Sequence, residues 1–359
     1  DAYPVTDLLT GLHDAGIETN DELSKFYTDY CSTRPSVGMA QQDWTLPEPN
    51  VSLYTDEMMA NAKAYSDTAM VVITRVGGEG ADLPTDMSAV VDGSWVRRVA
   101  DYRGSQRGAG YYNGTYDDSL NEGSDWDKGD HFLQLSNREE ELIDLVTSNF
   151  DNVIVVYNGA NAFEMDWVKN YPQIKGVLLC PGTGQSGFEG FGRVVAGEVN
   201  PSGHSADTFV YDLTAAPYFN NIGDFAYTNA DSVGYTVASQ AGGDAKLVPP
   251  HFVNYVEGIY VGYKFYETAA DEGLIDYDKE VVYPFGYGLS YTTFTQKMSD
   301  ITSDGSSLKF SVTVTNTGSA AGKDVVEIYN DPPYTNGGIE KASANLLDFA
   351  KTSELAPGG

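Results

Sequence analysis

Three apolar runs without polar alternation constrain the fold more than any other feature of this 359-residue sequence. They are AMVVITRV at residues 69–76, NVIVVYNGA at 152–160 and IKGVLLCPG at 174–182. Strands that are apolar on both sides are typical of parallel sheets covered by helices on both faces. Segments with helical spacing alternate with these runs, among them PVTDLLTGLHDAG, TDEMMANAKAYSD and SNREEELIDLVTSNF. The sequence therefore predicts an α/β fold with an open, mostly parallel sheet sandwiched by helices.

Capping signals indicate where some of these helices begin. Thr19 with Glu22 and Ser136 with Glu139 each match a capping box, in which two side chains bind the free backbone N–H groups of the first turn. The segment AFEMDWVKNY, residues 162–171, is expected to form another helix between the second and third apolar runs.

The pattern changes after about residue 300. SSLKFSVTVTNTGSAAGKDVVEIYNDPP alternates apolar and polar residues with period two, and NTGSAAG is the turn between its two strands. This alternation indicates the first half of an antiparallel β-sandwich. We therefore expect an α/β sandwich domain at residues 1–298 and a partial β-sandwich at residues 299–359.

Composition excludes several classes of function. The net charge is −31, with 52 acidic and 21 basic residues, so the basic surface that a nucleic-acid partner needs is missing. The two cysteines, Cys31 and Cys180, make neither a disulfide framework nor a zinc set, and Cys180 is expected to be a buried thiol. We expect neither a bound metal nor membrane insertion. The few cysteines favour a cytoplasmic location, but an export signal upstream of Asp1 is left open.

Glu79 is the candidate catalytic residue. It follows the first apolar run and is flanked by Gly78 and Gly80, in VVITRVGGEGADLP. Open α/β sheets bind their ligands at the carboxyl ends of the strands, and a carboxyl group presented there can act as a general acid. The alternative is that Glu79 is an ordinary acidic turn residue.

Two other motifs have a chemical and a structural interpretation. Gly182, Gly184 and Gly187 form a GxGxxG, the pattern of dinucleotide-binding loops, but no second apolar strand ending in an acid follows. A tight strand-to-helix turn is the alternative. Asp125, in GSDWDKGD, could be a nucleophile, but no apolar strand precedes it to hold it rigidly, and a turn is the alternative.

Several segments, taken in order, resemble the C-terminal half of a glycoside hydrolase family 3 β-glucosidase. They are VVITRVGGEGADLP, GTGQSGFEGFGRVVAGEVNPSG, EGIYVGYKFYET and VVYPFGYGLSYTTF. The tract VTVTNTGSAAGKDVVEIYNDPPY resembles the fibronectin-III-like domain that often follows. The resemblance extends from about Val71 to the end of the chain, and YPFGYGLSYTTF and GEVNPSG are its most specific motifs.

The resemblance implies a function and roles for particular residues. In this family a (β/α)₈ barrel carries a nucleophilic Asp, and the α/β sandwich domain supplies the acid/base glutamate, which is Glu79 here. Arg75 and Asp82 match the same motif and are expected to have supporting roles at the substrate site, orienting Glu79 or lining the cleft. The implied substrate is a β-glucoside or an oligosaccharide, without metal or organic cofactor.

The sequence also departs from the family pattern. The barrel is absent, so the partner expected for this chain is its own missing (β/α)₈ domain, and the chain alone should be inactive. His204 stands where an Arg or Lys is usual. We interpret the chain as a fragment, similar to a permuted branch in which the barrel follows. The alternatives are a non-catalytic carbohydrate-binding or adhesion module and a nucleotide-binding α/β protein.

Overall fold

The computed structural model describes residues 4–33, 44, 46, 48–77, 83–92, 125–219, 221, 227–229, 232, 235–237, 246–248 and 252–359. Its α-helices are α1 (Leu8–Asp14), α2 (Asp21–Tyr30), α3 (Asp56–Tyr65), α4 (Met87–Val91), α6 (Asn137–Asn149), α7 (Gly187–Val195), α9 (Tyr263–Asp271) and α10 (Tyr277–Glu280). The strands of the first two thirds are β1 (Thr68–Thr74), β2 (Asn152–Asn158), β3 (Ile174–Leu179), β4 (Phe209–Val210), β5 (Tyr235–Val237), β6 (Lys246–Val248) and β7 (Val281–Tyr283). The remaining strands are β8 (Phe294–Met298), β9 (Thr302–Ser303), β10 (Leu308–Lys309), β11 (Val312–Asn316), β12 (Val325–Asn330) and β13 (Asn345–Lys351).

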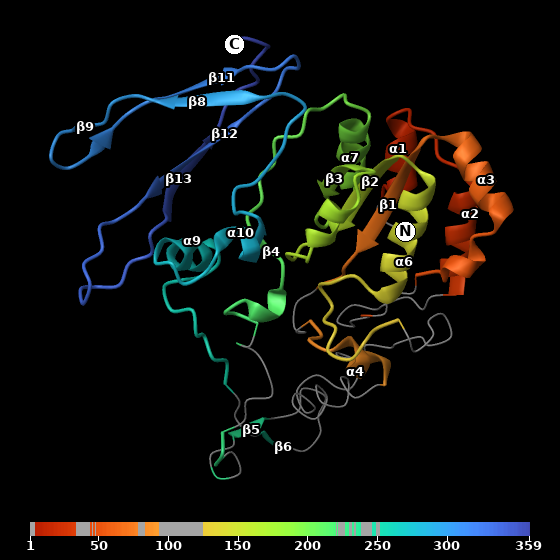
Figure 1. Cartoon of the computed structure of the whole chain (residues 1–359), viewed down its shortest axis with the longest axis horizontal. Coiled ribbons are helices and arrows are strands. Elements are labelled where there is room, and N and C mark those ends of the chain that lie inside the picture. The colour runs from red at the N-terminus through yellow and green to blue at the C-terminus, as the bar shows by residue number, and fades with distance from the viewer. Residues whose placement is uncertain are drawn as a thin grey trace. The chain divides into compact units, whose positions relative to one another are not determined.

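The three apolar runs form one parallel sheet in the order β1-β2-β3. In the central strand, Val155 and Val156 are both fully buried. Because neighbouring residues of a strand point to opposite faces, both faces of the sheet are covered. Helix α6 packs on β1 and β2 (Figure 1). The predicted parallel α/β sheet is therefore confirmed, and the two-sided burial explains why its strands lack polar alternation.

The structure confirms one capping box and corrects the other. Ser136 and Glu139 form the predicted box at the start of α6. The box predicted for Thr19 is wrong, because Asn20 is the N-cap of α2 and its side chain accepts a hydrogen bond from the backbone N–H of Leu23 at 3.0 Å. Asparagine is a better N-cap than threonine, and the helix begins one residue later than the predicted capping box requires.

The helix predicted at residues 162–171 is a shorter 3₁₀ helix, Asp166–Asn170. Phe163 and Met165, which precede it, are each 1% exposed, whereas the Glu164 side chain between them is 17% exposed. Met165 is the N-cap residue, with φ −125 and ψ 15 outside the helical region, so the helix begins only after these two buried side chains.

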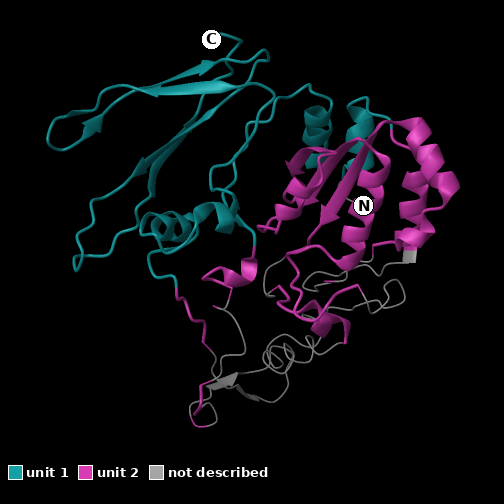
Figure 2. Ribbon diagram, in the orientation of Figure 1, with its two compact units in different colours: residues 1–18, 183–211, 257–359 teal, residues 19–182, 212–256 magenta. Residues whose placement is uncertain are grey.

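The chain divides into two compact units (Figure 2). Unit 1 comprises residues 1–18, 183–211 and 257–359, and unit 2 comprises residues 19–182 and 212–256. The parallel sheet and α6 belong to unit 2, whereas α1, α7 and all strands from β7 onward belong to unit 1. A domain boundary between residues 298 and 299 stays a prediction.

The last strands of unit 1 are antiparallel, as expected for the fibronectin-III-like part. β8 pairs with β11, β9 with β10, and β12 with β13. The two strands that flank the NTGSAAG turn, β11 and β12, thus belong to different pairs. A connection that crosses between strand pairs is typical of a β-sandwich.

Asn316 fixes the NTGSAAG turn. Its side chain is fully buried and donates to the carbonyl oxygens of Ala320 at 2.8 Å and Leu355 at 2.9 Å. Its Oδ1 accepts from the Thr292 hydroxyl at 2.8 Å and from the Gly318 N–H at 3.0 Å. Both amide hydrogens and both lone pairs are therefore used, which is the condition for burying an asparagine at low cost.

Two glycines bring α1 and α7 into close contact within unit 1. A Cβ on Gly11 would collide with the backbone carbonyl of Phe188, and a Cβ on Gly192 would collide with the carbonyl of Gly11. The helices therefore touch backbone to backbone at this point, and a larger residue at either position would separate them.

Among the described residues, no helix is long and apolar enough to cross a membrane. Within the same ranges, no group of three or more His, Cys, Asp or Glu side chains is arranged to hold a metal ion.

Gly192→Ala is expected to lower the free energy of unfolding by about 1–3 kcal/mol, because the added methyl group overpacks the contact between α1 and α7. Gly190 lies on the same helix with open space around its Cβ position. Gly190→Ala should raise stability by about 0.5–1 kcal/mol through helix propensity alone. Chemical denaturation of both variants checks this; equal effects would mean that the helices do not meet at Gly192.

Candidate active site

The carboxyl ends of β1, β2 and β3 lie at the same edge of the sheet, because the strands are parallel. Hydrogen bonds connect the segments that leave them. The Arg75 N–H, just after β1, donates to the Asn158 carbonyl at 3.1 Å. The Asn158 side chain donates to the Cys180 carbonyl at 2.7 Å. The strand ends are thus tied across the edge where open α/β sheets bind ligands.

The predicted site residues lie directly after β1. Glu79 and Asp82 fall in residues 78–82, outside the described residues, so their roles stay predictions. Arg75 is described, as is Gly77, two residues before Glu79. A Cβ on Gly77 would lie 3.0 Å from Oδ1 of Asn161, which follows β2. The chain at Gly77 therefore runs close to the loop after β2.

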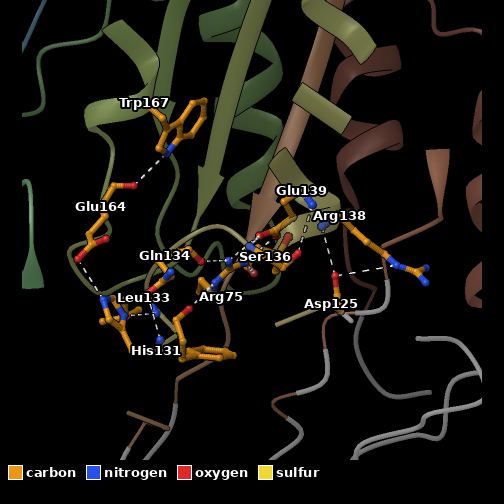
Figure 3. A network of polar contacts seen from close by, with 12 residues as sticks. Arg75, Asp125, His131, Leu133, Gln134, Ser136, Arg138, Glu139, Glu164 and Trp167 are labelled. Atoms are coloured by element: carbon orange, nitrogen blue, oxygen red, sulfur yellow. Dashed lines mark hydrogen bonds and ion pairs between the residues drawn. The ribbon is translucent and has the colours of Figure 1, made fainter. Parts of the chain in front are cut away.

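All five N–H donors of the Arg75 guanidinium have acceptors (Figure 3). Nε donates to the Phe132 carbonyl at 2.6 Å. Nη1 donates to the Thr74 carbonyl at 2.9 Å and to Glu139 Oε1 at 2.7 Å. Nη2 donates to the Gln134 carbonyl and to Glu139 Oε2 at 2.6 Å. One side chain thus connects the end of β1, the 132–134 segment and α6.

The Arg75–Glu139 pair is buried and bidentate. The side chains are 1% and 6% exposed, and Glu139 Oε2 also accepts the Ser136 N–H at 2.9 Å. The guanidinium carbon lies 4.8 Å from the centroid of the Phe163 ring, within range of a cation–π interaction. A direct contact between Arg75 and a substrate would require one of its five donors to be released. Of its two predicted supporting roles, this geometry favours positioning.

A second polar contact fixes the same region from the β2 side. Glu164 Oε1 accepts the Leu213 N–H at 2.7 Å and lies 3.0 Å from Nε2 of His131. Nδ1 of His131 accepts the Leu133 N–H at 3.1 Å, so Nδ1 carries no proton and Nε2 is the donor to Glu164. The loop after β2 is thereby joined to the segment that also binds Arg75.

Asp125, considered above as a nucleophile, is a buried group in a bend before α6. Its side chain is fully buried, and Oδ1 accepts the Arg138 N–H at 3.3 Å and lies 4.0 Å from Arg138 Nε. Burial raises the pKa of Asp125 to about 6, against the lowering effect of the hydrogen bond and charge of Arg138. Among the described residues, this carboxylate is in contact with Arg138 at the start of α6.

Sequence reasoning missed the partners of Arg75. Glu139 was identified as a capping residue, but its ion pair with Arg75 was not expected, because 64 residues separate the two. His131 and Glu164 carried no motif at all. The available signal was Arg75 itself, because a basic residue at the end of a buried strand needs an acidic partner in the core.

The other predicted features are structural. Gly184 has φ +59, a conformation that favours glycine, and the Gly187 N–H donates to the Thr183 carbonyl at 2.9 Å at the start of α7. GTGQSG therefore forms a tight turn into a helix. Cys180 is a buried thiol, as predicted, and burial raises its pKa.

Comparison with known proteins identifies the family. Residues 6–263, well over half of the chain, match the glycosyl hydrolase family 3 C-terminal domain. The chain belongs to glycosyl hydrolase family 3. β-Glucosidase A of Butyrivibrio fibrisolvens is 30% identical over 372 residues, which cover 99% of this chain and 38% of that protein.

Solved structures of β-glucosidases have a similar fold. A β-glucosidase from Paenibacillus barengoltzii aligns with a TM-score of 0.69 and 28% identity, covering 99% of this chain and 31% of that one. β-Glucosidase 3B from Thermotoga neapolitana, solved in complex with glucose, aligns with a TM-score of 0.69 and 27% identity, covering 100% of this chain and 40% of that one. The chain therefore spans less than half the length of these relatives.

Glu139→Gln is expected to lower the free energy of unfolding by about 3–5 kcal/mol, because it leaves the Arg75 charge buried without a partner. Glu141 lies on the exposed part of the same helix. Glu141→Gln removes an equal charge and should change stability by less than about 0.5 kcal/mol. Urea denaturation of the two variants measures the difference, and similar midpoints would show that the buried pair contributes little.

Proposed function

We propose that this chain is part of a retaining, exo-acting β-glycosidase that hydrolyses O-glycosidic bonds, with β-glucosides as substrates. Family 3 membership carries the proposal, together with the position of GGEG directly after β1. The relatives compared above are named β-glucosidases, and one of them was solved with glucose. The activity of the whole protein is inferred from them, because this chain spans less than half their length.

Glu79 is the proposed general acid/base. As an acid it protonates the glycosidic oxygen while the bond to the leaving group breaks. As a base it then removes a proton from the water that releases the sugar. Retention of configuration requires a second carboxylate as nucleophile, roughly 5–5.5 Å from the first. We assign that role to an Asp on a (β/α)₈ barrel domain outside this chain.

The supporting roles are assigned to Arg75 and Asp82. Arg75 is fixed by five hydrogen bonds four residues before Glu79, and the backbone just after it contacts the loop after β2. A rigid backbone before Glu79 reduces the conformational entropy that must be lost when Glu79 meets the glycosidic oxygen. Asp82, in the same motif, is the proposed residue at the substrate.

In the full-length protein, Glu79→Ala should lower kcat/KM for aryl β-glucosides with poor leaving groups by about 10²–10⁴-fold, because these depend most on protonation. Substrates with an activated leaving group should be affected much less at the glycosylation step. Azide should restore turnover and give a β-glycosyl azide as product. Glu141→Ala, which removes an exposed carboxylate, is the control, and wild-type kinetics in Glu79→Ala would refute the assignment.

Residues 1–359 alone should not hydrolyse nitrophenyl β-glucoside, since the nucleophile is assigned to another domain. Adding the separately produced barrel domain of the same protein should restore activity. Robust turnover by this chain alone would place both carboxylates within it. Binding of gluco-oligosaccharides by calorimetry, without turnover in the full-length protein, would instead favour a carbohydrate-binding module.

A further inference from the structure

Glu48 is a partly buried carboxyl between α2 and α6 that the proposed reaction does not use. Its Oε1 accepts the Tyr27 hydroxyl of α2 at 3.1 Å and the Tyr54 hydroxyl at 3.4 Å. The two hydroxyl oxygens lie 2.5 Å apart. A carboxyl group and two phenols thus lie within hydrogen-bonding distance of one another, and the two phenolic hydrogens serve two of the three contacts. We call these three side chains the Glu48 cluster.

The backbone of Glu48 binds both helices. Its carbonyl oxygen accepts Nη1 of Arg138, on α6, at 3.1 Å and the Tyr30 hydroxyl, on α2, at 3.4 Å. Arg138 in turn faces Asp125. Glu48 therefore links α2 to the start of α6, while α2 itself packs on α3.

We propose that the Glu48 cluster is a proton-dependent link between α2 and α6. The link is stable while the Glu48 carboxyl keeps its proton, and it weakens when the proton is lost. The inference concerns this chain's own residues and does not depend on the proposed glycosidase activity.

The surroundings of Glu48 disfavour its charged form. Among the described residues, the titratable and charged groups that face it are Tyr27 and Tyr30 of α2, Tyr54, Arg138 and Glu139 of α6, and Asp125. Burial is the largest effect and the charge of Glu139 adds to it, against the hydrogen bonds from the two tyrosines. Together they raise the pKa of Glu48 to about 8.

Neither the two phenols nor Asp125 titrates near pH 8, although Asp125 ionises at a lower pH. Arg75 neutralises Glu139 through their bidentate pair. Burial raises the pKa of Tyr27 and Tyr54 above their ordinary value, so both phenols keep their protons up to pH 9. Burial raises the pKa of Asp125 only to about 6. Glu48 is therefore the carboxyl of this cluster that ionises in the mildly alkaline range.

The direction of the effect follows from linkage. When α2 is released, Glu48 becomes solvated and its pKa returns to the ordinary value near 4.5. The attached state then binds more protons than the released state between about pH 4.5 and 8, so rising pH favours release. For one linked proton, the opening equilibrium constant increases up to tenfold per pH unit in this interval and is constant above it.

The experiment measures amide hydrogen exchange of residues 21–30 in the full-length protein from pH 5 to 9, corrected for the intrinsic exchange rate. Wild type should show an opening constant that rises up to about tenfold per pH unit and levels off near pH 8. Glu48→Gln keeps the hydrogen-bond acceptor but cannot ionise. The ratio of its opening constant to that of wild type should therefore change with pH. Glu57→Gln, at an exposed position of α3, is the control and should follow wild type.

A second measurement covers the case in which Glu48→Gln does not fold. Carbon-13 NMR of labelled glutamate side chains should show one carboxyl with a midpoint near pH 8 in wild type. Tyr27→Phe should raise this midpoint, because the Tyr27 hydroxyl bond favours the carboxylate. Any of three results would overturn the proposal. The first is parallel exchange profiles in wild type and Glu48→Gln, the second is the lack of a carboxyl that titrates near pH 8, and the third is an unchanged midpoint in Tyr27→Phe.

Discussion

The buried ion pair between Arg75 and Glu139 is the interaction on which the rest of unit 2 depends. Desolvating two charges is costly, and the cost is offset only where the geometry is good and every remaining donor is satisfied. Arg75 meets this condition with five acceptors drawn from three segments of the chain. The end of β1, the segment before α6 and α6 itself must therefore adopt one arrangement, because any other leaves a guanidinium donor unpaired in the core.

The other buried charges are arranged around this pair. Asp125 lies beside Arg138, and Glu48 lies beside two phenols, so two arginines face three carboxyl groups. Counting only the described residues, three ionised carboxylates near two cations would leave one negative charge uncompensated. Retention of a proton on Glu48 removes that charge, and the two phenols supply the polar partners that a neutral carboxyl needs. Burial of the carboxyl, reinforced by the charge of Glu139, is thus the main cause of the raised pKa of Glu48.

This arrangement separates structural from catalytic carboxyl groups. Glu48, Asp125 and Glu139 are held by arginines, phenols and a helix start, and the proposed reaction uses none of their oxygens. Glu79, by contrast, is surrounded in the sequence by glycines and follows a strand whose end is fixed. In the proposed mechanism Glu79 works with a carboxylate from another domain. A rigid strand end before Glu79 reduces the conformational entropy that is lost when the two carboxyl groups come together.

The sequence by itself determined the parallel sheet, the helix at residues 137–149 and the antiparallel character of the last sixty residues, because hydrophobic period and capping chemistry are local. It also indicated the family, through motifs in a fixed order. Tertiary structure decided what local signals leave open: which of Thr19 and Asn20 caps α2, where the 3₁₀ helix after Phe163 and Met165 begins, and which acid neutralises Arg75. These outcomes depend on groups far apart in the chain, whose contact and loss of water exist only in the folded protein.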